Sequence, residues 1–353
     1  MWEPVVTQSG RIDPLAGPEV FSPDGIYFDT PTYGLGPDAS IRAVLGAVDD
    51  WRAGTASMEV YDAAVARARE LFARIVDAPV ETVGIGAQVS ALVGPLAAAL
   101  PDGAEVVAPE GDFTSLLFPI LANEWRGVSL HTVPLGELAQ AVGPKTHTVA
   151  FSLVQSSSGE VADVAAVQAA ASEFGVRTLV DATHAAGWYP FSAADFDLVV
   201  VAAYKWLLCP RGVAFVTVRE PRSVPSLNAG WYSGEDPWTS IYGTPLRLAD
   251  SARRFDLSPA WMSWMGAVPS LELIASLGVD RIHSHDLALA DRLRAGAGLP
   301  TSPSAIVRLN GVDADVLKAA GITAATRASS VRVGCHLYNS SDDVDALIDV
   351  LGR

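Results

Sequence analysis

Short apolar, β-branched runs alternate with longer segments of helical spacing between residues 82 and 218. Apolar runs of about four to eight residues that are bounded by turn residues predict buried strands. The predicted strands cover residues 82–85, 104–108, 148–153, 177–180, 198–203 and 213–218. Because strands that alternate with helices are typical of a doubly wound sheet, we expect an α/β fold whose main sheet is mostly parallel.

The segments outside this block follow other patterns. Residues 1–25 are rich in proline and glycine and are expected to form an arm. Helical spacing at residues 38–52 places four apolar side chains on one stripe, namely Ile41, Val44, Leu45 and Val48. Helices and short strands are also expected after residue 246. We therefore predict a large domain (26–245) and a smaller C-terminal α+β domain (246–353), on which the arm packs.

Composition and charge narrow the possible partners. The chain has 353 residues, of which half are hydrophobic and 18% charged, so it can bury a large core. A net charge of −16 argues against a nucleic acid or an anionic membrane as partner. The apolar run at 83–100 contains glycines and Pro95 and is expected to be a turn and a buried helix. The start lacks the features of a signal peptide, and two cysteines suit a reducing cytoplasm.

Two residues that carry chemistry follow neighbouring predicted strands. Asp181 directly follows the strand at 177–180, and Lys205 comes shortly after the strand at 198–203. The ends of parallel strands open onto one edge of the sheet, where ligands bind. A lysine at a buried strand end loses solvation, so its pKa falls and its amine becomes a nucleophile. Taken singly, each residue is more often a surface or turn residue, but together they are the amine and carboxylate that pyridoxal phosphate (PLP) requires.

The wider pattern resembles a known family. It consists of Asp181-Ala-Thr-His184 with Gly187, followed by Tyr204-Lys205-Trp206 and a Pro-Arg-Gly turn. This is similar to the fold-type-I PLP enzymes of the class V aminotransferase superfamily, which includes kynureninases, isopenicillin N epimerase-like proteins and cysteine desulfurases. The resemblance implies a seven-stranded, mostly parallel sheet with a smaller C-terminal α+β domain. It also implies a homodimer with shared active sites and an amino acid as the small-molecule substrate.

The resemblance assigns roles around the cofactor. Lys205 forms the Schiff base, Asp181 binds the ring nitrogen, and His184 lies beside the ring. Other expected cofactor contacts are the amides of Ala87 and Gln88, the ring of Phe113, the amide of Gln155, the Tyr204 hydroxyl and, from the partner subunit, Ser258. A phosphate-binding role for these amides is also expected without the resemblance. Where a strand, a small-residue turn and a helix N-terminus meet, free N–H groups and the helix dipole form an anion site.

The substrate is expected to meet three further residues. In the resembled family the arginine that matches Arg332 binds the α-carboxylate, for which a guanidinium is suited by its bidentate geometry. Tyr33 lies in a loop that borders the substrate site in that family. Trp231 lies in an aromatic loop, and such loops often line a pocket or an interface.

The sequence leaves the reaction open. The His184 and Tyr204 variants resemble kynureninase and favour lyase-type cleavage at Cβ, for example of a cysteine conjugate, over transamination, while epimerisation is a third branch. Residues 321–330 contain no cysteine, which argues against persulfide chemistry. A non-catalytic binding protein on the same fold is the alternative of another class. No metal site is expected, because His283-x-His285-Asp286 lacks further ligands, and Val89 breaks a dinucleotide-binding glycine pattern.

Overall fold

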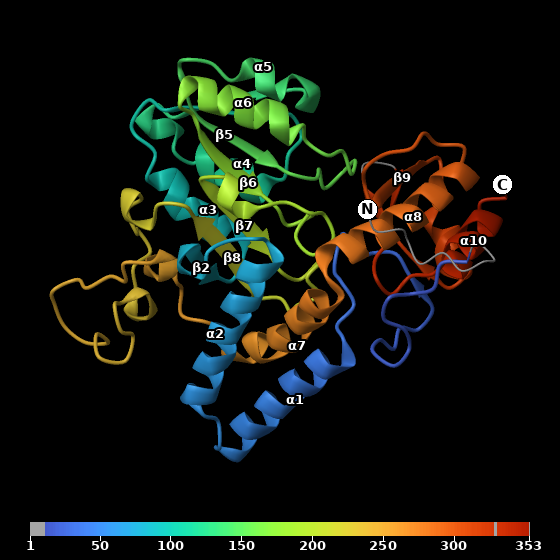
Figure 1. Cartoon of the computed structure of the whole chain (residues 1–353), viewed down its shortest axis with the longest axis horizontal. Coiled ribbons are helices and arrows are strands. Elements are labelled where there is room, and N and C mark those ends of the chain that lie inside the picture. Colours follow the sequence, from blue (N-terminus) through green and yellow to red (C-terminus); the bar gives the residue numbers. More distant parts are fainter. Residues whose placement is uncertain (1–10, 328–329, 353) are drawn as a thin grey trace.

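The computed structural model describes residues 11–327 and 330–352. A seven-stranded sheet covered by helices forms the larger part, and a three-stranded sheet with two long helices forms the smaller part (Figure 1). The segment that begins at residue 11 runs between the two parts.

The large sheet is mostly parallel, which confirms the expected fold class. Its strands are β2 (Val83–Gly86), β3 (Glu105–Pro109), β4 (Ser129–Val133), β5 (Thr146–Ser152), β6 (Arg177–Asp181), β7 (Leu198–Ala202) and β8 (Ala214–Val218). They lie in the order β2-β8-β7-β6-β5-β3-β4. Only β8 runs antiparallel, to both of its neighbours.

Helices cover both faces of this sheet, and the continuous apolar character of its central strands follows from that arrangement. On one face the core includes residues of α2 (Met58–Ile75), α6 (Val164–Phe174) and α7 (Trp261–Leu277). On the other face it includes residues of α3 (Val89–Ala98) and α4 (Thr114–Leu121). A short helix, α5 (Leu138–Ala141), contributes Leu138 to the first core. Because helices close both faces, the strand ends are where a ligand can enter.

The small sheet has one apolar and one basic face. Its strands β9 (Ile306–Asn310), β11 (Ala325–Arg327) and β12 (Ser330–Gly334) are antiparallel, in the order β11-β12-β9. Alternate residues such as Val307 and Val331 enter a core shared with α8 (Val279–Gly296), α9 (Ala314–Ala319) and α10 (Ser341–Val350). Since side chains alternate across a strand, arginines of this sheet lie on the opposite face.

The segment from residue 11 to residue 37 connects the small domain to the large one. β1 (Ile26–Tyr27) pairs in parallel with β10 (Ile322–Thr323), and the amide of Leu15 donates to the Leu337 carbonyl. Further along, the amide of Gly34 donates to the carbonyl of Tyr204 at 3.0 Å. The arm thus contacts both the small domain and the segment that carries Lys205.

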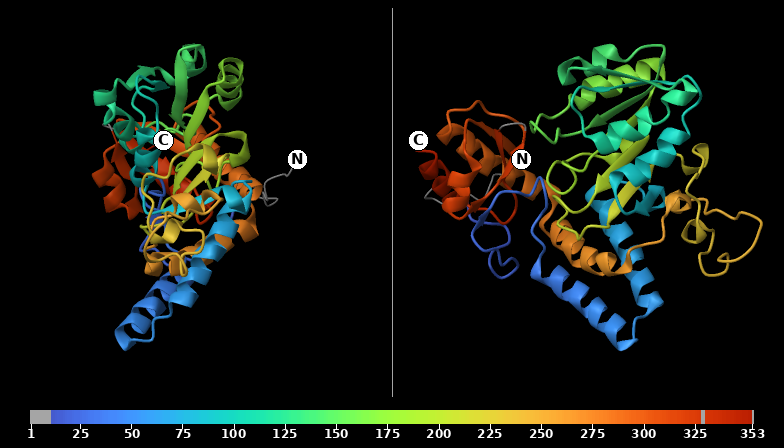
Figure 2. Two further views of the ribbon diagram at one scale, coloured as in Figure 1. Left: turned by 90° about the vertical axis from the view of Figure 1, so that its left-hand side faces the viewer. Right: turned by 180° about the vertical axis from the view of Figure 1, so that it is seen from behind.

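Helix α1 (Asp38–Ala53) departs from the sequence expectation. It packs along α7, but its far end projects from the molecule together with the start of α2 (Figure 2). Three residues of the predicted apolar stripe, Ile41, Leu45 and Val48, are exposed, and so is Trp51. Most of the stripe therefore does not face the core of this chain, although half-buried Val44 lies against Gly266 of α7. The domain boundary expected at residue 246 stays a prediction, and α7, which follows it, packs on α1 and α2.

Among the described residues, no single helix is both long and apolar enough to cross a membrane. Helices α7 and α8 reach that length and composition only as a pair, and the pair is bent by 81°.

Candidate active site

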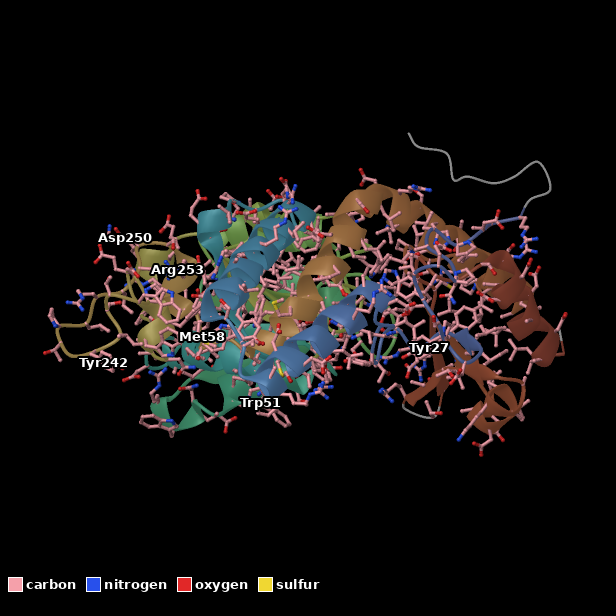
Figure 3. The ribbon with its side chains drawn as sticks, turned by 90° about the horizontal axis from the view of Figure 1, so that it is seen from below. Tyr27, Trp51, Met58, Tyr242, Asp250 and Arg253 are labelled. Carbon is pink, nitrogen blue, oxygen red and sulfur yellow. The ribbon has the colours of Figure 1, made fainter. Side chains whose placement is uncertain are left out.

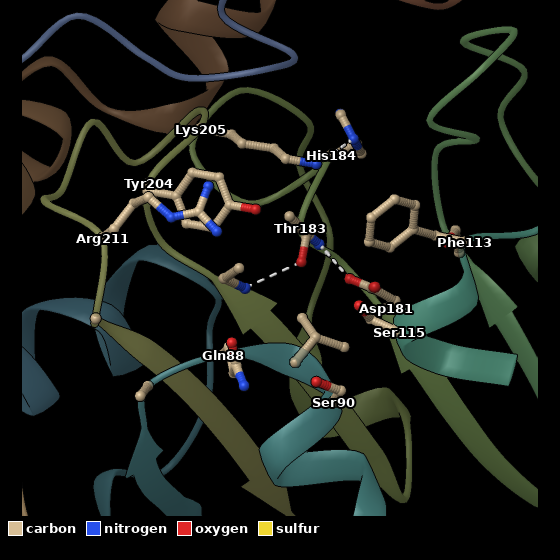
Figure 4. Close-up of a pocket in the computed structure, with 15 residues that line it drawn as sticks. Gln88, Ser90, Phe113, Ser115, Asp181, Thr183, His184, Tyr204, Lys205 and Arg211 are labelled. Carbon is tan, nitrogen blue, oxygen red and sulfur yellow. Dashed lines mark hydrogen bonds between the residues drawn. The ribbon is translucent and has the colours of Figure 1, made fainter. Parts of the chain in front are cut away.

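A pocket lies at the carboxyl ends of β6 and β7, beside the turn between β2 and α3 (Figure 4). Many of the residues singled out in the sequence line it, namely Ala87, Gln88, Phe113, Asp181, His184, Tyr204 and Lys205. The folding of parallel strands thus brings together residues that are more than a hundred positions apart.

Lys205 provides a buried amine. Its side chain is 5% exposed, and its Nζ lies 2.7 Å from Nε2 of His184. Burial lowers the pKa of Lys205 to about 7, although the charge of Asp181 acts in the opposite direction. The positive charges that add to the lowering belong to Arg332, Arg327 and Arg211. An unprotonated amine is therefore present at neutral pH.

Asp181 provides a buried carboxyl group at the end of β6. Its Oδ1 accepts a hydrogen bond from the amide of Thr183 at 2.9 Å. Burial raises the pKa of Asp181 to about 6, against the hydrogen bonds of Thr183 and the charge of Lys205. The Thr183 hydroxyl accepts from the amide of Ala202 at 2.9 Å, which joins the turn after β6 to β7.

His184 lies between the amine of Lys205 and the indole ring of Trp206. Burial and the charge of Lys205 hold the pKa of His184 well below its usual range, so the ring is neutral. The Trp206 indole N–H donates to Nδ1 of His184 at 3.4 Å. This hydrogen bond assigns the ring proton to Nε2, which then donates to the unprotonated amine of Lys205.

A residue of the small domain forms a hydrogen bond with the segment that carries Lys205 and Trp206. The carbonyl of Trp206 lies 3.0 Å from Nε2 of His336, and Nδ1 of His336 lies 2.9 Å from Oδ2 of Asp286. A carbonyl oxygen can only accept a hydrogen bond, so Nε2 of His336 donates to Trp206. His336 and Asp286 are fully buried. The segment with Lys205 is thereby bound to α8, which carries Asp286.

Two features of the pocket favour an anion, namely the N-terminus of α3 and the guanidinium of Arg211. At the N-terminus of α3, the side chain of Gln88 makes no capping hydrogen bond. The Arg211 guanidinium lies 4.3 Å from the centroid of the Tyr204 ring. Arg211 and Ser90 line the pocket although the sequence did not single them out as site residues. Arg211 lies shortly after the Tyr-Lys motif and Ser90 shortly after the small-residue turn, and this proximity could have identified both as pocket residues.

Asp112 is a further residue that sequence reasoning missed. This buried carboxylate accepts from the amide of Ser152 at 2.7 Å and from Nε2 of Gln155 at 3.0 Å. Gln155 is therefore engaged by Asp112 and does not line the pocket. Its expected contact with the cofactor stays a prediction.

Arg332 lies beside the pocket, covered by two segments. It is 1% exposed, and its Nη1 donates to the carbonyl and the hydroxyl of Ser156. Its Nη2 donates to the Thr32 hydroxyl at 2.9 Å. Burial lowers the pKa of Arg332 to about 10, and the charge of Arg327 adds to this. Ser156 follows β5, and Thr32 belongs to the loop that packs on the Lys205 segment.

The comparison with known proteins identifies the family. The family described as Aminotransferase class-V matches residues 42–307, about three quarters of the chain. The chain belongs to this family. It is therefore a PLP-dependent enzyme, as the arrangement of Lys205 and Asp181 led us to expect.

Curated relatives of this class V enzyme carry several activities in their names. It is 27% identical to "Uncharacterized aminotransferase YcbU" of Bacillus subtilis, over 80% of this chain and 81% of that protein. It is 26% identical to isopenicillin N epimerase of Streptomyces clavuligerus, over 81% of this chain and 83% of that protein. A kynureninase of Bacillus thuringiensis is 26% identical over 44% of this chain and 38% of its own.

Solved structures confirm the fold. The cystine C-S lyase C-DES superposes with a TM-score of 0.84 over 94% of this chain and 98% of its own, at 18% identity. A cysteine desulfurase from Thermococcus onnurineus NA1 superposes with a TM-score of 0.81 over 93% and 94%, also at 18% identity. Another C-DES structure carries glycine covalently linked to its PLP cofactor.

The residues of the pocket fit PLP. Lys205 would supply an amine for the aldehyde, and Asp181 would supply a carboxyl group for the ring nitrogen. The free N–H groups at the start of α3, together with Arg211, suit a phosphate. Phe113, whose ring centroid lies 5.3 Å from Nζ of Lys205, supplies an aromatic face.

The remaining predicted residues lie elsewhere in the class V enzyme. Tyr33 is exposed, with its ring centroid 5.8 Å from that of Tyr204. Ser258 is exposed and follows Leu257, whose amide donates to the carbonyl of Ile85 on β2. Trp231 packs against Tyr232 and Trp238. Ser258 and Trp231 do not line the pocket of this chain, and their roles stay predictions.

Proposed function

We propose that this PLP-dependent enzyme acts at Cα and Cβ of an amino acid, with Lys205 as the Schiff-base residue and the base at Cα. The observation that supports the proposal is the 2.7 Å pair of Lys205 and His184 at the pocket. Bound PLP supplies an electron sink for the substrate. Asp181 holds a proton on the ring nitrogen, and the unprotonated Lys205 amine removes the proton at Cα.

We favour lyase-type cleavage at Cβ, for example of a cysteine conjugate. Elimination needs a base at Cα and an acid for the leaving group at Cβ, and Lys205 and His184 provide two proton carriers in contact. A persulfide route is not supported, because Cys209 and Cys335 are buried and burial raises the pKa of both thiols. Arg332 would bind the α-carboxylate of the substrate, and Tyr33 would border it.

The first experiment tests the Schiff base and then the products. We expect a visible absorption band that borohydride bleaches, with the adduct on Lys205 by peptide mapping. Lys205→Ala should lose the adduct, whereas Lys145→Ala, at an exposed lysine, should keep it. With β-substituted amino acids we expect a keto acid, ammonia and the free leaving group without any amino acceptor.

An aminotransferase is the second candidate, because the YcbU likeness covers 80% of this chain. In that case keto acid would form beyond one equivalent per active site only when a second keto acid accepts the amino group, and no ammonia would be released. Racemisation without either product would support an epimerase. A chain that remains colourless with added PLP would contradict the enzyme proposal and leave a binding protein on the same fold.

We also propose that two copies form a dimer with shared active sites. The exposed apolar residues of α1 support this, because such patches mark contact surfaces. A dimer would also allow the exposed Ser258 to approach the partner's site. Sedimentation velocity measures the assembly. A cytoplasmic location is a further proposal, based on two buried, unpaired cysteines, and cell fractionation tests it.

A further inference from the structure

Three arginines lie on the basic face of the small sheet. Arg332 on β12 is directly opposite Arg308 on β9, and Arg327 on β11 is opposite Ser330, two residues before Arg332. Because alternate residues of a strand share a face, these side chains are on the same side. Within residues 11–327 and 330–352, none of the three arginines forms an ion pair with a carboxylate.

Two of these arginines converge on one hydroxyl group. Nη2 of Arg327 lies 3.0 Å and Nη2 of Arg332 lies 2.9 Å from Oγ1 of Thr32. The two guanidinium groups are therefore neighbours, and their like charges repel. Arg332 is covered, whereas Arg327 is exposed at the edge of the sheet. An exposed guanidinium next to a buried one is accessible to an anion that enters from solvent.

The charge of Arg327 acts on the reactive group. It contributes to the lowered pKa values of Lys205, His184 and Arg332. Arg327 thus belongs to the electrostatic environment of the active site.

One half-buried carboxyl group, that of Asp29, interacts with the charges of this pair. Asp29 is close enough that Arg332 and Arg327 act on its pKa, but burial has the larger effect and raises that pKa. Its Oδ1 has no hydrogen-bond partner among the described residues. The chain as a whole has a net charge of −16. Two neighbouring arginines that form no ion pair within the described residues are therefore a local exception, which favours an anionic ligand.

We propose that Arg327 binds a second acidic group, on the side chain of the substrate, while Arg332 binds the α-carboxylate. The substrate class is then an α-amino acid with an anionic side chain, such as a carboxylate or a sulfinate. This inference rests on the proposed function, because it places the amino acid between Lys205 and the two arginines. Paired arginines suit two planar anions, since each guanidinium offers parallel N–H donors.

The test measures binding rather than turnover. Dissociation constants of glutamate and glutamine, and of aspartate and asparagine, are determined by calorimetry on the PLP-loaded enzyme. Each pair has nearly the same size and differs in one charge. We expect the acid to bind at least about tenfold more tightly than its amide, since a charge-assisted pair contributes about 1.4 kcal/mol or more.

Variants separate the two arginines. Arg327→Gln should reduce the acid-to-amide preference to about one and leave amide binding nearly unchanged, whereas Arg332→Gln should weaken acid and amide alike. Arg327→Lys keeps the charge and should retain part of the preference. Arg281→Gln, which removes an exposed arginine of α8, is the control and should keep the full preference.

Two results would overturn the inference: equal binding of acid and amide by the unchanged enzyme, or an undiminished preference in Arg327→Gln. Failure of the proposed function is distinguishable from either. A chain without the Lys205 adduct contradicts the proposed function, and the inference falls with it. A chain that forms the adduct and binds amino acids without discrimination contradicts only the role of Arg327.

Discussion

Burial lowers the pKa of Lys205 to about 7, so a substantial unprotonated fraction of its amine is present near neutral pH, and nearby charges adjust this pKa in both directions. Asp181 stabilises the ammonium form, while three arginines destabilise it. The reactivity of one side chain therefore depends on residues from both domains. His184 adds a hydrogen bond that only the unprotonated amine can accept.

The first prediction concerns the pH dependence of Lys205 in the apoprotein. Its rate of reductive methylation should rise through about pH 7, because the reactive form appears as pH passes the lowered pKa. Arg332→Gln removes a destabilising positive charge and should move the midpoint up. Asp181→Asn removes a stabilising negative charge and should move it down. Peptide mapping against the exposed Lys145 measures the rate, and a Lys205 that reacts in parallel with Lys145 would contradict the prediction.

Sequence reasoning identified the residues whose chemistry is tied to a local pattern. Lys205, Asp181 and His184 follow predicted strands within a recognisable motif. Asp112 and Thr32 carry no such signal, because they matter through contacts with Ser152 and Arg332 that form only when distant segments meet. A polar residue in a loop does not reveal its partner.

At the scale of elements, the loop after β1 packs directly on the lysine segment. A Cβ atom at Gly34 would lie 2.1 Å from the Lys205 carbonyl oxygen, far closer than atoms can approach. At Gly36 the nearest atom to such a Cβ would be Cγ1 of Ile41 at 3.5 Å, an ordinary contact. The loop therefore has no room for a side chain at Gly34 but has room for one at Gly36.

The second prediction uses this difference. Gly34→Ala must displace the loop or the lysine segment, so it should lower stability by at least about 1–3 kcal/mol and weaken PLP binding. Gly36→Ala should change neither. Urea unfolding and PLP titration provide the two measurements. Equal behaviour of the two variants would show that the loop does not hold Lys205 in place.

The elements themselves were predictable where their patterns are local. Most central strands of the large sheet start and end within two residues of expectation. Strand β4 was missed because, at the edge of the sheet, it is only partly buried and contains Ser129, His131 and Thr132. Helix α4 was missed because Pro119 interrupts its pattern. The pairing of β1 with β10 joins residues almost 300 positions apart, which no local pattern can show.

For the whole molecule, the apolar stripe on α1 is the largest departure from expectation. Helical spacing predicts an apolar face but not what covers it. Trp51 is 68% and Leu45 57% exposed (Figure 3 labels Trp51 and Met58, near the junction of α1 and α2). The same pattern that predicts a core contact within one chain also suits a contact between two chains.

The third prediction tests that contact. Trp51→Ala combined with Leu45→Ala should weaken the proposed dimer by at least about tenfold, because large buried side chains dominate interface energies. Trp125→Ala is the matched control, since Trp125 is 81% exposed and lies between α4 and β4. Sedimentation velocity over a range of concentrations measures the change. A chain that is monomeric at every concentration would contradict the proposal.

The connection between the arm and the small domain has a consequence for biosynthesis. The ribosome makes Leu15 and Ile26 before the large sheet, and it makes Leu337 and Ile322, their partners, after that sheet. At ordinary elongation rates, the interval between the synthesis of the arm and that of its partners lasts on the order of tens of seconds. The large sheet can form in that interval, but Thr32 and Arg332 meet only afterwards. We therefore expect the nascent chain to gain its lysine pocket early and its substrate selectivity late.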